Sequence, residues 1–548
     1  MKQLVVSGEI SNKFIIFGLI GISIIAFFIR FLYFPYDAPF SLDATTYFSY
    51  AYEIARDGRF PENFILPNNG WPVFLSVFFR ILETGEFQTF VDLQRTISIV
   101  ISIITIIPMY FLCRNFFGKM ISFIGASLLI LEPRVISNSI LGITEPLFNL
   151  LIITSLVFFF NKTKWFYLSF ATLALATIIR YEGLLLLIPF LVMVLVKFRK
   201  DNKKKISVLL CLGIFILVLF PMTMIKIDTM GTDGTFSHVS TGMNVIFKHV
   251  IQGNPPESLG AADFPGEKNT FRLHNFLGDS FSKMFFSLGL IQIPIFFLFL
   301  PIGIFFLFRK DKIKNMNYKH VTLILFLIFA SLTMLYAHGR GIMELRYYLI
   351  LYPIIILLCC FGIQKINGKI NSKILLSLVL GFTIIISFSY MEYNKIDYEF
   401  EREAFEITSI AVDMSNKINA NSLHGYFITT AGMTEDWPDL KRPSISNELK
   451  ISPYIVCHFN DKAEQVCDNN SDSLEEFISK GKDNGLDHIV VDNLEHGPEF
   501  IQDIFDNEEK YFYLEKVFDS KEKGYKYFVK IFKIDFEIFE EKISNKNE

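Results

Sequence analysis

Long apolar runs recur along most of the chain and predict its overall organisation. A run of about 20 apolar residues crosses the hydrocarbon core of a bilayer as a helix. Some runs here reach that length, and shorter ones follow each other closely, as a chain that crosses and returns would require. The expected spans, about 11 in all, are 14–34, 95–112, 120–131, 145–160, 165–179, 183–196, 206–225, 284–308, 320–336, 348–364 and 374–391. The pattern predicts a polytopic α-helical membrane protein.

The apolar runs stop after residue 391. Helical periodicity returns over 401–418 and 474–480, and 488–492 is typical of a strand. Residues 511–517 and 525–533 predict a strand pair joined across 521–524. We therefore expect a transmembrane domain over residues 1–391, followed by a soluble α/β domain over 392–548.

The distribution of charge predicts how the chain is oriented in the membrane. The chain of 548 residues is 51% hydrophobic and 20% charged, with a net charge of −3, which argues against a nucleic-acid binder held by bulk electrostatics. Residues 1–391 carry a net +13 and residues 392–548 a net −16. Short basic segments alternate with the spans, and Lys and Arg accumulate on the cytoplasmic side. We expect a cytoplasmic N-terminus, an uncleaved first span and an extracytoplasmic C-terminal domain in an integral protein of the cell membrane.

The first external loop carries the first candidate for chemistry. Read as a helix, Asp43, Tyr47, Tyr50 and Ile54 lie on one face at spacings of four, three and four. The helix is rich in aromatic residues and only moderately apolar, so we expect it to lie along the membrane surface. Asp43 is then either a carboxylate available at the outer boundary or simply a first-turn acid favoured by the helix dipole.

A second short interfacial helix is expected after Asn68-Asn69-Gly70-Trp71-Pro72, over residues 73–79. Trp71 would lie at headgroup level, where it acts as an aromatic anchor or contacts a substrate.

Ionisable residues also stand at other external helix ends. They are Arg30, Glu145, Arg180, Glu182, Lys226 and Arg346. Charges at membrane depth are costly and suggest function, although a helix-end charge can also reach water by extending its side chain. A cationic cluster facing a carboxylate at the outer leaflet would suit a lipid-linked phosphate, which Arg binds bidentately.

Cysteine spacing gives no zinc signature. Four cysteines lie in or beside apolar runs and are most simply packing residues. Cys457 and Cys467 are the two in the tail, and this pair could close a small disulfide loop if the tail is extracytoplasmic. Whether a metal binds is unknown from the sequence: a divalent ion is compatible with it but unsupported.

In their order and placement these motifs resemble the GT-C glycosyltransferases. The resemblance covers about residues 10–391 and rests on the loop aspartate with its spaced Tyr, Gly-Trp-Pro, Glu-Pro-Leu-Phe, Arg-Tyr-Glu-Gly and the late Arg-Tyr-Tyr. The nearest branch is similar to protein O-mannosyltransferases and aminoarabinose transferases. Many relatives have Asp-Glu in the first loop, whereas Ala44 follows Asp43 here, which puts a second carboxylate and any metal it would bind in doubt.

The resemblance implies transfer of a sugar from a polyprenyl-phosphate carrier to an acceptor hydroxyl at the outer membrane face, with inversion. Asp43 would be the general base. The donor phosphate and lipid would contact Arg180, Arg346, Lys226 and Arg30, and the sugar or acceptor would be oriented by Tyr47, Glu145, Glu182 and Trp71. No cofactor is required. The acceptor is a protein, lipid or glycan.

Three alternatives remain open. An oligosaccharyltransferase would transfer a whole glycan to asparagine, but the Trp-Trp-Asp signature is absent and the tail has only Trp437. A transporter or flippase of polyprenyl-linked lipids would use the same arginines and need no base. A structural membrane protein with a ligand-binding ectodomain would need neither Asp43 nor Arg346.

Overall fold

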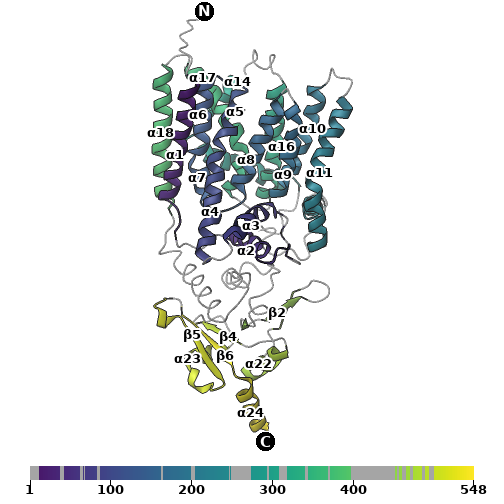
Figure 1. Ribbon diagram of the computed structural model, residues 1–548, viewed down its shortest axis with the longest axis vertical. Helices are drawn as coiled ribbons and strands as arrows, with labels where there is room; N and C mark the ends of the chain where they lie inside the picture. Colours follow the sequence, from purple (N-terminus) through teal and green to yellow (C-terminus); the bar gives the residue numbers. More distant parts are fainter. Residues whose placement is uncertain are drawn as a thin grey trace, which may run out of the picture. The chain divides into compact units, whose positions relative to one another are not determined.

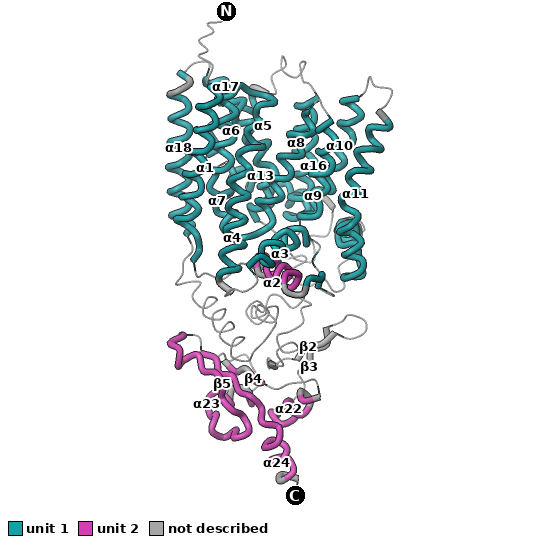
Figure 2. Tube along the Cα trace, in the orientation of Figure 1, with its two compact units in different colours: residues 1–36, 57–395 teal, residues 37–56, 396–548 magenta. Residues whose placement is uncertain are grey.

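The computed structural model describes a helical part and a mixed α/β part of the chain. The described residues are 11–36, 42–61, 66, 68–82, 87–161, 164–198, 204–245, 247, 273–292, 295–307, 318–339, 344–367, 371–395, 451–452, 456–459, 465–468, 473–483, 488–492, 499–526 and 528–547. They fall into two compact units (Figure 2). Unit 1 comprises residues 1–36 and 57–395, and unit 2 comprises residues 37–56 and 396–548.

Unit 1 is built from helices that lie side by side (Figure 1). Their bounds are α1 Asn12–Leu32, α3 Gly70–Leu82, α4 Phe87–Ile104, α5 Ile106–Arg114, α6 Lys119–Ile130, α7 Pro133–Ser139, α8 Glu145–Phe160, η1 Lys164–Tyr167, α9 Leu168–Ile179, α10 Glu182–Lys197, α11 Lys204–Met230, α12 Phe236–Val245, α13 Leu273–Gln292, α14 Leu300–Leu307, α16 Tyr318–Gly339, η3 Leu345–Leu351, α17 Tyr352–Asn367 and α18 Ser372–Tyr393. The expected apolar runs lie mainly on these helices, although 95–112 is divided between α4 and α5 and 284–308 between α13 and α14.

Fewer helices qualify as spans than the sequence suggested. Within the described residues, six helices are long and apolar enough to cross a bilayer, or seven if the bent pair α6 and α7 is one span. Helices α3 and α8 and the η1–α9 segment are apolar but shorter. The expected count of about 11 is therefore not confirmed, and an interfacial position of α2 or α3 stays a prediction.

The bend between α6 and α7 follows from the sequence at the break. The two helices meet at 48°. Pro133 opens α7 and has no backbone N–H to continue the ladder of α6, and it disfavours a helical conformation at Glu132. Glu132 is extended, and its carboxylate accepts a hydrogen bond of 2.9 Å from the Val135 N–H. The break therefore begins a new, capped helix.

Helices α14 and α17 approach closely because glycines face each other. A Cβ atom on Gly303 would lie 1.8 Å from the Leu358 carbonyl oxygen, and one on Gly362 would lie 2.5 Å from the Phe299 carbonyl oxygen. Small residues allow such backbone contact between membrane helices, where dispersion rather than the hydrophobic effect drives association.

The two ends of the helical unit differ in chemistry. At one end, Lys197 Nζ donates 2.8 Å hydrogen bonds to the carbonyls of Phe159 and Asn161, at the C-terminal end of α8, and lies 3.9 Å from the Phe166 ring centroid. At the other end of α8, Glu145 meets Arg180. The separation of basic helix ends from the Glu145–Arg180 end agrees with the expected topology, while the side that faces the cytoplasm stays a prediction.

Unit 2 contains α2 Leu42–Asp57, except for its last residue, and an α/β tail. The tail comprises β1 Ile451–Ser452, β2 Val456–Phe459, β3 Gln465–Asp468, α22 Leu474–Asp483, β4 His488–Asp492, α23 Glu499–Asp506, η4 Glu508–Lys510, β5 Leu514–Asp519, η5 Lys521–Lys523, β6 Val529–Ile534 and α24 Phe536–Asn547. Four strands form a sheet in the order β1-β4-β6-β5, and β2 pairs with β3. Alternate residues of β4 and β6 pack beneath α22 and α24, which explains the buried Ile489, Val491 and Phe532.

The expected tail elements are confirmed where the structure describes them. The helix near 474–480 and the strand 488–492 are present, and β5 and β6 form the expected antiparallel pair. Gly524 closes their connection with a φ of 81°, which favours glycine. The helix expected over 401–418 lies outside the described residues.

Candidate functional site

Arg180 is the centre of a buried charged cluster in unit 1. Its Nη1 lies 2.6 Å from Glu145 Oε1, and its Nη2 lies 2.6 Å from Glu182 Oε1. Nε donates to the same Glu182 oxygen at 3.1 Å, and Nη1 also donates to Thr144 Oγ1 at 3.1 Å. Arg180 and Glu182 are each 8% exposed and Glu145 is 4% exposed. The three residues are therefore in direct contact, while their expected position at the external face stays a prediction.

Local structure places each member of this cluster. Glu145 is the first residue of α8 and Glu182 the first residue of α10, so both carboxylates lie at helix N-termini, where the dipole favours negative charge. Arg180 caps the end of α9 in an extended conformation. The two-residue turn from α9 to α10 thus brings one guanidinium between two carboxylates. A buried guanidinium is tolerated because its donors are satisfied by charged acceptors.

The two oxygens of Glu182 differ in their surroundings. Oε1 accepts both Arg180 hydrogen bonds. Oε2 is buried and has no hydrogen-bond partner among the described residues. In contrast, both Glu145 oxygens are used, since Oε2 accepts a hydrogen bond from the Thr144 hydroxyl at 3.1 Å. A buried carboxylate oxygen without a donor is costly and is a place where a ligand group can bind.

Tyr347 links this cluster to a second arginine. The Arg180 guanidinium carbon lies 5.7 Å from the Tyr347 ring centroid, and that of Arg346 lies 5.6 Å from it. Arg346 also pairs with Glu344, and its side chain is 23% exposed. Two of the expected phosphate ligands, 166 positions apart in sequence, therefore contact one aromatic ring, and Arg346 is the more accessible of the two.

The Asn-Asn-Gly-Trp segment packs against the turn between α9 and α10, which carries the cluster. Asn68 Oδ1 accepts a 3.2 Å hydrogen bond from the Tyr181 N–H. A Cβ atom on Gly70 would lie 2.8 Å from the Ile178 carbonyl oxygen, so α3 begins in direct contact with the end of α9. This support was not expected from the sequence, because nothing in the spacing relates residue 68 to residue 181.

Trp71 lies inside the helical unit rather than on its surface. Trp71 is fully buried, and its indole N–H donates a 3.0 Å hydrogen bond to the Gly142 carbonyl. Gln94 Nε2 donates to the same oxygen at 2.8 Å. Trp71 therefore packs inside the helical unit, with its one polar group on the backbone of the α7–α8 connection, and its expected role at headgroup level or with a substrate stays a prediction.

The structure gives no support to the expected contact of Arg30 with a donor phosphate. Arg30 has no exposed surface, and its guanidinium donates hydrogen bonds of 2.9 to 3.0 Å to four acceptors. These are the hydroxyls of Ser139 and Ser102 and the carbonyls of Ala26 and Ile130. Arg30 joins α1, α4, α6 and α7 as an internal cross-link, because Arg offers five donors in a rigid fork.

Lys226 is buried near the C-terminal end of α11. It is 1% exposed, and its Nζ donates to Thr235 Oγ1 at 3.3 Å. A Cβ atom on Gly234 would touch the Lys226 side chain at 2.8 Å. The turn that follows α11 therefore covers the lysine stem, and a role with phosphate stays a prediction.

Asp43 and Tyr47 belong to unit 2. The expected helix is present as α2, with Asp43 half-buried in its first turn and Tyr47 and Tyr50 buried. Since α2 and the Arg180 cluster lie in different units, a shared chamber for Asp43 and the arginines stays a prediction.

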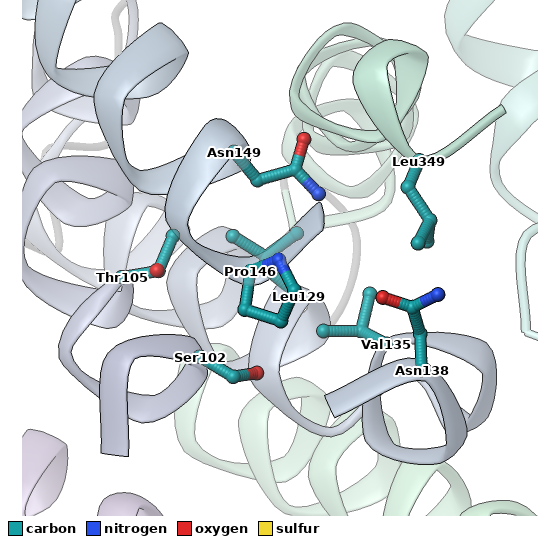
Figure 3. A pocket seen from close by; sticks show the side chains of 8 residues that line it. All are labelled: Ser102, Thr105, Leu129, Val135, Asn138, Pro146, Asn149 and Leu349. Carbon is teal, nitrogen blue, oxygen red and sulfur yellow. The ribbon is translucent and has the colours of Figure 1, made fainter. Parts of the chain in front are cut away.

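A small cavity lies elsewhere in unit 1 (Figure 3). It is lined by Ser102, Thr105, Leu129, Val135, Asn138, Pro146, Asn149 and Leu349. Its volume of about 10 Å³ corresponds to a single water. The buried Asn149 Oδ1 has no hydrogen-bond partner among the described residues. A cavity of this size is far too small for a sugar or a polyprenyl chain.

Metal ligands are not gathered in the described residues, where no group of three or more His, Cys, Asp or Glu side chains could hold an ion.

Comparisons with known proteins match a segment of the sequence and the overall fold. Residues 70–225 match the family model described as dolichyl-phosphate-mannose-protein mannosyltransferase. A search of curated proteins found no match.

Solved structures give a longer overlap. The oligosaccharyltransferase AglB from Archaeoglobus fulgidus, in complex with an inhibitory peptide and a dolichol-phosphate, has a TM-score of 0.50 at 11% identity, covering 92% of this chain and 73% of AglB. The same enzyme with zinc and sulfate has a TM-score of 0.52 at 13% identity, covering 92% and 71%. ArnT from Cupriavidus metallidurans bound to undecaprenyl phosphate has a TM-score of 0.43 at 14% identity, covering 76% and 75%.

Proposed function

Because the chain has the fold of the GT-C superfamily of polyprenyl-phosphate-dependent glycosyltransferases, we propose that it is a membrane glycosyltransferase. It takes a sugar from a polyprenyl-phosphate donor and transfers it to an acceptor hydroxyl at the outer membrane face, with inversion at the anomeric carbon. The complex of AglB with a dolichol-phosphate supports a lipid-linked phosphate as the donor class.

One observation carries this proposal. Arg180 and Arg346, from distant parts of the sequence, both contact the ring of Tyr347 at one end of the helical unit, and Arg180 lies between two buried carboxylates. Ionisable side chains at such positions are costly and mark functional sites in membrane proteins. A structural membrane protein has no need to bring four charges together there.

The accessible arginine is suited to the donor phosphate. Arg346 is partly exposed and can present its fork to phosphate oxygens, whereas the Arg180 donors bind Glu145, Glu182 and Thr144. Lys226 is a second candidate for the phosphate. We therefore assign Arg346 to the donor phosphate and Arg180 to the ordering of the carboxylates.

The reaction needs one base and no acid. Asp43 accepts the proton of the acceptor hydroxyl while that oxygen attacks the anomeric carbon from the face opposite the phosphate. The bond between the anomeric carbon and the phosphate oxygen breaks, and its electron pair stays on the departing polyprenyl phosphate. Phosphate is a weak base, so fixed positive charge from Arg346 can stabilise it without protonation. Tyr47, Glu145 and Glu182 orient the sugar or acceptor.

Substitution of Asp43 tests the mechanism. The full-length protein in detergent would be supplied with decaprenyl-phosphomannose and a Ser/Thr-containing peptide. Asp43→Asn should lower transfer by at least about 100-fold while donor binding persists, because general base catalysis contributes about this much. Glu53→Gln, on the same helix, is the matched control and should transfer normally. Transfer by Asp43→Asn at the normal rate would remove Asp43 from the mechanism. If the natural protein transfers no sugar but moves lipid across the membrane, and Asp43→Asn still does so, the protein is a flippase.

An oligosaccharyltransferase is the second candidate, favoured by the overlap of 92% of this chain with AglB. The two activities differ in the acceptor atom. Peptides that contain only asparagine or only serine and threonine, analysed by mass spectrometry, would separate them.

A further inference from the structure

We propose that the Glu145–Arg180–Glu182 cluster recognises the sugar of the lipid-linked donor, and that Glu182 Oε2 accepts a hydrogen bond from a sugar hydroxyl. This inference rests on the proposed function and assigns the sugar and the phosphate of one donor to different side chains.

The first argument is the state of Arg180. Its three nitrogens make four hydrogen bonds of 2.6 to 3.1 Å to protein oxygens. A phosphate could reach the guanidinium only by displacing a carboxylate held at 2.6 Å. Two carboxylates beside the same guanidinium would also repel a phosphate, since like charges at short range disfavour each other. The cluster is therefore poorly suited to the anionic part of the donor.

The second argument is the unused oxygen of Glu182. Oε2 is buried and has no partner among the described residues, while Oε1 is held by two donors from Arg180. A carboxylate is an acceptor only, so the group that satisfies Oε2 must bring a proton. Sugar hydroxyls are neutral donors and meet this requirement, whereas a phosphate ester at neutral pH does not.

The third argument is access and orientation. The Glu182 side chain is 10% exposed, so part of it reaches the surface beside the buried Oε2. Arg180 donates two hydrogen bonds to Oε1, which orients the carboxylate. Both guanidinium groups lie close to the Tyr347 ring, at 5.7 Å for Arg180 and 5.6 Å for Arg346 from its centroid. Arg346, the more accessible of the two arginines, is assigned to the phosphate.

Lipid binding without turnover tests this assignment. The natural protein and its variants, purified in detergent, would be titrated with decaprenyl phosphate, decaprenyl-phosphomannose and decaprenyl-phosphoglucose. Glu182→Gln keeps the oxygen that binds Arg180 but replaces the acceptor at Oε2 with an amide donor. We expect about a tenfold loss of affinity for a sugar-bearing lipid and an unchanged affinity for decaprenyl phosphate.

Two control variants separate this effect from damage to the fold. Arg346→Gln should weaken the bare and the sugar-bearing lipids alike. Glu132→Gln, at a buried acid outside the cluster whose two oxygens both have protein partners, should lower thermal stability without changing the ratio of the two affinities.

Each contrary result has a distinct meaning. If the natural protein binds none of the three lipids, the proposed function fails and this inference fails with it. If it binds sugar-bearing lipids and Glu182→Gln leaves the ratio unchanged, or weakens all three lipids equally, sugar recognition by Glu182 is overturned while the proposed function stands. An equal affinity of the natural protein for bare and sugar-bearing lipids would also overturn it.

Discussion

Arg180 Nη1 and Glu145 Oε1 lie 2.6 Å apart and join the first residue of α8 to the turn between α9 and α10. The same guanidinium reaches Glu182 at 2.6 Å, so one cation holds the beginnings of two helices. The arrangement lies at the opposite end of α8 from Lys197. A charged cross-link at this place ties the fold of the helical unit to the geometry of the candidate site, and it has consequences for stability as well as binding.

Arg180→Gln should destabilise the helical unit. Removing the guanidinium leaves two buried carboxylates without a counter-charge, which costs about 3–5 kcal/mol when one partner of a buried pair is lost. Thermal unfolding in detergent would measure this, with the exposed Arg80→Gln as the control. Adding Glu145→Gln to the Arg180 variant should recover part of the lost stability. If the stability losses of the two single variants simply add in the double variant, Arg180 and Glu145 do not interact.

Gly70→Ala should displace α3 from the end of α9. The added methyl group would lie 2.7 to 2.8 Å from atoms of Ile178, including backbone atoms that cannot rotate away. We expect a loss of stability of about 1–3 kcal/mol, as for overpacking of a core, together with weaker donor binding. Gly21→Ala is a close control, because a Cβ atom there meets nothing within 4 Å. Equal melting temperatures for the two variants would be inconsistent with the close approach.

Trp71→Phe should remove a buried hydrogen bond and little else. The indole N–H donates to Gly142 O, and its loss should cost about 1 kcal/mol. The exposed Trp165→Phe serves as control. Because Trp71 is internal, we expect donor affinity to follow the small change in stability. If Trp71→Phe lost affinity for sugar-bearing lipids while keeping full stability, Trp71 would instead contact the substrate.

The hairpin of β2 and β3 predicts a disulfide. Its antiparallel register places residue 457 directly opposite residue 467. Directly opposed positions have Cα atoms about 4.5–5.5 Å apart, within the range of a disulfide. If the tail is extracytoplasmic, protein from intact cells should show this bond in peptide mapping without reductant, while the buried Cys113, Cys211, Cys359 and Cys360 stay reduced. Alkylation of both tail cysteines before reduction would argue for a reducing compartment.

Acid should loosen the tail at Asp503. Its carboxylate accepts hydrogen bonds from the Tyr511 hydroxyl at 2.5 Å, from Asn507 Nδ2 at 2.6 Å and from Lys510 Nζ at 3.2 Å. The Tyr511 hydrogen bond, followed by that of Lys510, lowers the pKa of Asp503 below its ordinary value of 3.8. A lowered folded-state pKa gives stability that is present above the unfolded pKa and is lost as pH falls through the folded pKa.

Hydrogen exchange of peptides from 499–519, corrected for the intrinsic rate, would follow this loss from pH 5 down to pH 2. Protection should fall over that window in the natural protein and be lower and less pH-dependent in Asp503→Asn. Parallel pH profiles for the two proteins would show that Asp503 does not contribute.

Much of the fold follows from local patterns. The apolar runs located the helices of unit 1, and alternation located β4, β5 and β6, because both signals depend on neighbouring residues along the chain. The resemblance to the GT-C superfamily, drawn from short motifs in order, is confirmed by the structural comparisons. The expected number of spans is not confirmed, since an apolar run can form a short or bent helix as readily as a crossing one.

Which charges are functional was decided by tertiary structure. Arg30 and Arg180 look alike in sequence, each an arginine at the end of an apolar run, yet Arg30 is a fully buried cross-link and Arg180 organises two carboxylates. Trp71 likewise looked like a surface residue. The sequence by itself determined the membrane helices, the α/β tail and the set of candidate charges, because these depend on local hydrophobicity and periodicity. Only the packing of distant helices decided which donors and acceptors satisfy each other, since a hydrogen bond depends on positions in space that no local pattern records.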